Sequence, residues 1–141
     1  MISKIKIIAI GKVKEKYLLE GINEYLKRLG RYCKVEILEL KDEGLVKEAE
    51  KISRYLSNNA FVLDEKGKQF SSVEFSELIK KQDGELTFII GGPEGISAEI
   101  KQKSKLFSLS KMTFIHEMTR LILLEQIYRS YMILHNTQYH K

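Results

Sequence analysis

Five short apolar runs alternate with longer segments of helical periodicity along this chain of 141 residues. The runs, each expected to form a strand, are residues 2–10, 34–40, 61–63, 86–90 and 106–109. Between and after them, apolar residues recur three or four positions apart, as in helices that cover a sheet. Strands joined through helices pair in parallel with right-handed connections. The alternation therefore predicts the α/β class, with a parallel sheet covered by helices on both faces.

Several helix ends are visible in the sequence. Ser71 or Ser72 suits the N-cap of the third helix, and Ser97 suits the N-cap of a short fourth one. The last helix is expected over residues 117–135, with an amphipathic pattern. No linker, repeat or low-complexity segment interrupts the chain, so we expect one domain over residues 1–141.

Composition and charge narrow the class of protein. With 43% apolar and 30% charged residues, the chain is typical of a globular protein, and no run approaches the ~20 apolar residues that span a bilayer. The N-terminus lacks the apolar core of a signal peptide. The single cysteine, Cys33, cannot form an internal disulfide, which fits a cytoplasmic location. The net charge of +5 suits either a polyanionic partner or a lysine-rich solvated surface.

A glycine-rich segment, residues 91–95 (Gly-Gly-Pro-Glu-Gly), follows the most apolar run. Its glycines allow either a close backbone approach to a ligand or a tight turn from strand to helix. No Gly-Lys-Ser/Thr follows, so it is not a P-loop, and Gly11 alone after the first run does not make a dinucleotide fingerprint. In parallel sheets, ligands lie beyond the carboxyl ends of the strands. The loops expected after Leu63, Ile90 and Leu109 share that edge, which predicts a cofactor pocket there.

The loop before the last helix, residues 109–114 (Leu-Ser-Lys-Met-Thr-Phe), is rich in small and hydroxyl-bearing side chains. Its backbone groups are suited to an adenine edge, and its hydroxyls to a ribose. It also suits the start of the last helix, with Thr113 as N-cap. The two interpretations are compatible.

The C-terminal residues 136–141 (Asn-Thr-Gln-Tyr-His-Lys) combine an aromatic ring, an imidazole and a cation. A tyrosine can stack on a base, a histidine can hydrogen-bond or move a proton, and a lysine can contact a phosphate. The alternative is a tail docked on its own domain. His116, His135 and His140 have no neighbouring cysteine or clustered carboxylates, so we expect no metal site.

Taken together, these segments resemble the ribosomal RNA large-subunit methyltransferase H family, in the SPOUT class of knotted methyltransferases. The resemblance runs through nearly the whole chain. It is carried by residues 10–14 (Ile-Gly-Lys-Val-Lys), 25–29, 63–68, 88–95, 109–113, Arg120, 124–129 and 139–141 (Tyr-His-Lys). One departure is Ile115, where family members often carry proline before the histidine.

The resemblance implies a trefoil knot near the C-terminus and S-adenosylmethionine bound in a bent form within it. The residues that it assigns to cofactor binding are Leu63, Gly91, Gly92, Leu109, Ser110, Lys111, Met112, Thr113 and Phe114. It also implies a homodimer with the last helix at the interface and the partner completing each site. The reaction would be N3-methylation of a pseudouridine in a hairpin loop of 23S rRNA, within the assembled ribosome.

For the reaction itself, the expected catalytic residues are His140, Tyr139 and Arg129, with His140 as proton acceptor or base-orienting group. The expected RNA contacts are Lys12, Lys14 and Lys141.

The sequence is compatible with other roles and functions. Arg120 is either functional or paired with a carboxylate such as Glu117. Two other functions compete with the enzyme: an RNA- or ribosome-binding module without catalysis, and a small nucleotide-binding regulator. The missing phosphate motif argues against the regulator.

Overall fold

The structure, a computed structural model, describes residues 2–140, apart from the side chain of Ser3. Its strands are β1 (Ile2–Ile10), β2 (Lys34–Leu40), β3 (Ala60–Gln69), β4 (Gly84–Ile90) and β5 (Lys105–Ser108). Its helices are α1 (Lys16–Leu29), α2 (Leu45–Tyr55), α3 (Ser72–Lys81), α4 (Ala98–Gln102) and α5 (His116–Leu134). Each run predicted as a strand forms one, and a helix follows each strand. The α/β class is therefore confirmed.

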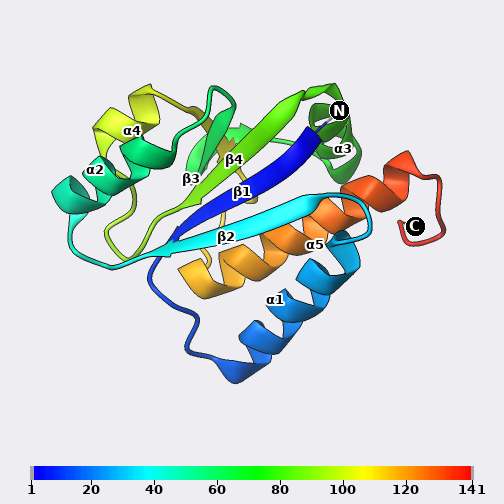
Figure 1. The fold of residues 1–141 in the computed structure, drawn as a ribbon, viewed down its shortest axis with the longest axis horizontal. Helices are drawn as coiled ribbons and strands as arrows, with labels where there is room; N and C mark the ends of the chain where they lie inside the picture. Colours follow the sequence, from blue (N-terminus) through cyan, green and yellow to red (C-terminus); the bar gives the residue numbers. More distant parts are fainter. Residues whose placement is uncertain (1, 141) are drawn as a thin grey trace.

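The strands form one sheet in the order β2-β1-β4-β3-β5, and all neighbouring strands are parallel. Helices α1, α3 and α5 cover one face, and α2 and α4 cover the other (Figure 1). Alternate residues of β1 belong to the two cores: Ile5 and Ile7 pack beneath α1 and α5, while Ile8 and Ile10 pack on the opposite side. A strand segment buried on both faces must be apolar at nearly every position, which is why residues 7–10 of β1 and 88–90 of β4 are continuous apolar runs.

Helix α5 lies between α1 and α3 in its layer (Figure 1). It was predicted to be amphipathic, and that prediction is wrong, because its apolar side chains are spread round the axis. Three of them, Met118, Ile122 and Ile133, are only half-buried. Their spacing of 4 and 11 residues places them on one face of the helix. Apolar residues on the face of a helix that its own domain leaves half-buried indicate a further partner.

Strand β3 continues past the predicted end at Leu63. Leu63 and Lys68 both pair with Phe107 of β5, so residues 64–67 form an excursion inside the strand and not a loop after it. Gly67 is required there, because a Cβ at this position would lie 2.5 Å from the backbone nitrogen of Phe107. The predicted strand end was wrong because the polar residues of the excursion have the composition of a loop.

Two predicted helix caps are also visible. Ser71, and not Ser72, is the N-cap of α3; its hydroxyl accepts from the backbone N–H of Glu74, whose carboxylate accepts from the N–H of Ser71. Ser97 caps α4 as predicted. Within residues 2–140, the structure contains no helix with the length and apolarity that a membrane span requires.

Candidate functional site

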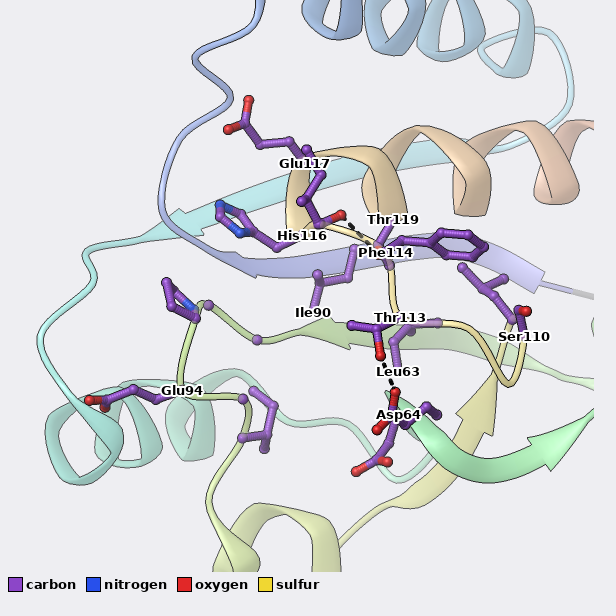
Figure 2. Close-up of a pocket in the computed structure, with 18 of the residues that line it drawn as sticks. Leu63, Asp64, Ile90, Glu94, Ser110, Thr113, Phe114, His116, Glu117 and Thr119 are labelled. Carbon is purple, nitrogen blue, oxygen red and sulfur yellow. Dashed lines mark hydrogen bonds between the residues drawn. The ribbon is translucent and has the colours of Figure 1, made fainter.

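A pocket of about 700 Å³ opens at the carboxyl ends of the central strands (Figure 2). Three segments line most of it: the excursion of β3, the loop after β4, and the chain between β5 and the first turn of α5, and Lys101 of α4 also contributes. Eight of the nine residues assigned to the cofactor line this pocket: Leu63, Gly91, Gly92, Leu109, Ser110, Met112, Thr113 and Phe114. The ninth, Lys111, is exposed and does not line it. The volume suits a ligand of nucleoside size.

The glycine loop that follows β4 closes on itself. The backbone N–H of Gly95 donates to the carbonyl oxygen of Gly92 at 3.0 Å, and Gly95 has a φ of +77°. A Cβ on Gly91 would lie 2.6 Å from the carbonyl oxygen of Gly95, so the closed loop has no room for a side chain there. A Cβ on Gly92 would instead meet Cγ2 of Ile10 at 3.0 Å. Loop closure is thus a second reason for glycine at position 91, besides backbone approach to a ligand.

The segment before α5 is held by its own hydroxyls. Ser108 Oγ donates to the carbonyl oxygen of Ser110 at 2.8 Å, and Ser110 Oγ accepts from the backbone N–H of Met112 at 3.0 Å. The hydroxyl of Thr113, labelled in Figure 2, donates to Glu65 on the β3 excursion, so two of the segments that line the pocket are bonded to each other. The prediction that Thr113 is the N-cap of α5 is therefore wrong. That position is held by Ile115, which makes no side-chain capping bond.

The pocket wall carries more negative than positive charge. Asp64, Glu65 and Glu94 line it, and Lys101 is the lysine among its lining residues. Lys101 Nζ lies 2.7 Å from Asp64 Oδ2, and this bond holds the pKa of the Asp64 carboxyl below its usual range. With Lys101 neutralised by Asp64, the remaining carboxylates favour a ligand that carries positive charge.

Glu117, in the first turn of α5, is turned toward the loop that precedes α1 (Figure 2). Its Oε1 accepts from the backbone N–H groups of Glu15 at 3.1 Å and Lys14 at 2.6 Å, and these bonds hold the pKa of Glu117 below its usual range. The loop is thereby attached to the rim of the pocket. Lys12 and Lys14, both predicted to contact RNA, are exposed on it.

Arg120 is buried one turn further along α5. Its Nη1 lies 2.5 Å from Glu39 Oε2 at the end of β2, and its Nη2 donates to the carbonyl oxygen of Gly11 at 3.3 Å. Arg120 is therefore paired with a carboxylate, the second of its two expected roles, but the partner is Glu39 and not Glu117, which is engaged by the loop before α1. Arg120 thus joins α5 to the ends of β1 and β2.

The C-terminal tail folds back on its own domain (Figure 1). The ring of Tyr139 stands edge-on to Tyr128, with 4.9 Å between centroids, and its hydroxyl lies 3.2 Å from both Tyr25 Oη and Glu125 Oε1. Burial raises the pKa of the Tyr139 phenol, so its hydroxyl remains a donor to Glu125. Lys141 lies outside the described residues.

The three predicted catalytic side chains meet in this tail. The guanidinium of Arg129 lies 4.9 Å from the centroid of the Tyr139 ring, and its Nη1 lies 3.1 Å from His140 Nδ1. Glu125 joins them by pairing with Arg129, with Oε1 2.5 Å from Nη2. The sequence interpretation missed Glu125, although its spacing of four residues from Arg129 is a usual signal for an ion pair on a helix.

The tail and the pocket of one chain do not meet. None of the tail residues that the structure describes lines the pocket. Glu125, which contacts Tyr139, follows His116 at the pocket by nine residues, or about 14 Å along the helix axis.

His116 lines the pocket, and no group of three His, Cys, Asp or Glu residues suited to a metal occurs within the described part of the chain.

Comparison with known proteins identifies the family. A family model described as "Predicted SPOUT methyltransferase" matches residues 3–140. A protein of Caldicellulosiruptor bescii is 43% identical over 153 residues, covering 97% of this chain and 99% of its own. Proteins of Acetivibrio thermocellus and Streptococcus gordonii are each 44% identical over 158 residues, covering 98% of this chain and 99% of their own. All three are called ribosomal RNA large subunit methyltransferase H. This chain therefore belongs to the ribosomal RNA large subunit methyltransferase H family of SPOUT methyltransferases, as its sequence resemblance predicted.

Proposed function

We propose that the protein transfers the methyl group of S-adenosylmethionine to N3 of a pseudouridine in a hairpin loop of 23S rRNA. The observation that carries this proposal is that eight residues assigned to the cofactor line one pocket. The chain that contains this pocket belongs to the methyltransferase family described above. Family membership favours an enzyme over the non-catalytic binding module and over the nucleotide-binding regulator.

The pocket suits the cofactor in size and charge. S-adenosylmethionine supplies an electrophilic methyl group, whose bond to sulfur breaks as the bond to N3 forms, leaving S-adenosylhomocysteine. The carboxylates of Glu65 and Glu94 complement the positive sulfonium, and the backbone of residues 109–113 provides donors and acceptors for the adenine. Since the methyl is already reactive, the protein's main contribution is to align N3 with it and to help the N3 proton leave.

The pocket and the tail lead us to propose a homodimer in which each tail serves the partner's pocket. Two features support this arrangement: the half-buried apolar face of α5 (Met118, Ile122 and Ile133) and the tail docked beside that helix, away from its own pocket. A two-fold dimer buries the same patch on both subunits. Pairing through α5 would cover the apolar face and carry Tyr139 and His140 toward the other subunit.

Mixing two inactive chains tests the dimer. One chain carries Gly91→Val, which damages the pocket, and the other lacks residues 139–141. If the site is shared, subunit exchange forms mixed dimers that contain one intact site, and an equimolar mixture should recover about one quarter of the wild-type rate. Each variant alone serves as the control. A mixture as inactive as its components, after exchange has been verified by mass, would show that the tail does not serve a partner.

We also propose that the C-terminal segment completes a trefoil knot, an exception to the usual absence of threading. Residues 109–115 return from the edge strand β5 to α5 in the middle of the helical layer, and Thr113 bonds the β3 excursion on the way. In this proposal, residues 109–115 pass through a loop of the chain that starts at the β3 excursion. The segments that form the knot would then be the same segments that line the pocket.

The substrate that we propose is the assembled ribosomal particle. Lys12 and Lys14 are exposed on the loop that Glu117 attaches to the pocket rim, where they suit phosphates. Phosphate contacts carry no sequence information, so the shape of the folded particle must select the nucleotide.

The decisive experiment supplies labelled S-adenosylmethionine and the protein to ribosomes from cells that lack it. We expect one methyl group per particle, at a pseudouridine identified by mass spectrometry, and little transfer to free 23S rRNA. Absence of label from the rRNA of intact ribosomes would contradict the proposed function. Efficient labelling of free rRNA would contradict only the requirement for an assembled particle.

A further inference from the structure

The hydrogen bond between Arg129 and His140 determines which imidazole nitrogen carries the proton. Arg129 Nη1 lies 3.1 Å from His140 Nδ1. A guanidinium has only donors and does not lose its proton in a protein, so Nδ1 must be the acceptor. In a neutral imidazole whose Nδ1 accepts, the proton resides on Nε2. His140 therefore presents an N–H donor on the side of the ring away from Arg129.

Arg129 is itself held in place. Glu125 Oε1 lies 3.0 Å from Arg129 Nε and 2.5 Å from Nη2, and this pairing raises the pKa of the guanidinium further. The guanidinium also lies over the ring of Tyr139, whose hydroxyl donates to the same Glu125 carboxylate. A network in which each member bonds the next fixes both the position and the tautomer of the last one, His140.

We propose that His140 acts on the pseudouridine as a hydrogen-bond donor, through Nε2–H, to a carbonyl oxygen beside N3, and does not accept the N3 proton. This inference rests on the proposed function. N3 of the base lies between two carbonyl groups, so the charge left when its proton departs is shared with their oxygens. A donor aimed at such an oxygen stabilises the anion that attacks the methyl group. The proton itself leaves to water, and the nitrogen lone pair then forms the bond to carbon.

The opposite role, general base, conflicts with the same contact. A base must end the step as an imidazolium, with protons on both nitrogens. The proton on Nδ1 would then face the Nη1–H of Arg129, setting two donors and two positive charges against each other. Relief would require Arg129 to leave Glu125 and Tyr139 or the His140 ring to turn away, and either movement breaks the network. The geometry thus favours the donor over the acceptor.

Two substitutions at one position separate the roles. The amide nitrogen of glutamine can take the place of Nε2–H as a donor, but the amide cannot accept a proton at neutral pH. We expect His140→Gln to keep kcat within about tenfold of wild type on ribosomal particles, and His140→Ala to lose about 10²- to 10³-fold, as for loss of a donor to a developing anion. The pH profile of His140→Gln should keep the shape of the wild-type profile.

The outcomes decide between the roles. Equal large losses in both variants, or a pH profile altered by glutamine on its acid side, would establish His140 as a base and overturn the inference. Near-wild-type activity in both would also overturn it, since His140 would then make no contact that matters. Calorimetric binding of S-adenosylmethionine, unchanged in each variant, controls for folding. Failure of the proposed function is separate, because it would appear as inactivity of the wild-type protein.

Discussion

Removal of residues 139–141 should lower the rate of methyl transfer by about a thousandfold or more, while S-adenosylmethionine binds as tightly as to the intact protein. The reason is the separation of the two parts of the site. None of the described tail residues lines the pocket, and the contacts of Tyr139 are with α1 and the middle of α5. Single-turnover kinetics on ribosomal particles measures the rate, and calorimetry measures the affinity.

A milder change in the same tail provides the control for this truncation. Tyr139→Phe removes the hydroxyl that bonds Tyr25 and Glu125 but keeps the ring beneath Arg129 and against Tyr128. Its rate should fall by about tenfold, the cost of one hydrogen bond to a charged group. A truncated protein that had also lost its affinity for S-adenosylmethionine would contradict the division between a pocket that binds the cofactor and a tail that acts on the base.

Substitution of Gly91 should have the largest effect on binding of the cofactor. In Gly91→Ala, the new Cβ would lie 2.6 Å from the carbonyl oxygen of Gly95 and 2.7 Å from its carbonyl carbon. Both are backbone atoms, so no side-chain rotation relieves the clash and the loop must open. Crowding of this kind typically costs about 1–3 kcal/mol, and the affinity for S-adenosylmethionine should weaken by about ten- to a hundredfold. Calorimetric titration of the purified variant measures the change.

The neighbouring glycine is a matched control. In Gly92→Ala, the nearest atom to the new Cβ is Cγ2 of Ile10 at 3.0 Å, the end of a side chain that can shift. We expect this variant to lose about threefold in affinity or less. Similar losses at Gly91 and Gly92 would mean that closure of the loop on Gly95 is not what makes position 91 sensitive. Thermal unfolding of both variants reports any wider damage to β4.

The location of the pocket was predictable from the sequence. The carboxyl ends of parallel strands share one edge of a sheet, so segments that follow such strands converge there whatever their separation along the chain. This rule is why the sequence predicts that Gly91 and Thr113 line one pocket, and in the structure they do. The rule does not assign partners within the edge. Thr113 was predicted to cap α5, whereas its hydroxyl bonds Glu65 on the β3 excursion.

Helix α5 shows what the spacing of apolar residues in a sequence cannot predict. Its sequence was interpreted as amphipathic because Leu124 and Ile127 recur at helical spacing, and both are indeed buried. The structure adds two neighbouring helices, α1 and α3, so that α5 is enclosed on three sides. Gly21 of α1 lets Leu121 approach closely, since a Cβ there would lie 3.0 Å from Leu121 Cδ1. The sequence pattern of α5 alone does not predict a contact that depends on a residue of another helix, such as Gly21.

The sequence by itself determined the α/β class and the edge of the sheet at which the pocket lies. Both follow from the spacing of apolar residues along each segment, which distinguishes strands from helices. The polar partners that lie far apart along the chain were decided by the tertiary structure alone. Thr113 and Glu65 are 48 residues apart, and Arg120 and Glu39 are 81 apart. A side chain's local neighbours encode whether it is buried, but a hydrogen bond depends on distance and direction to a group that only the folded chain brings near.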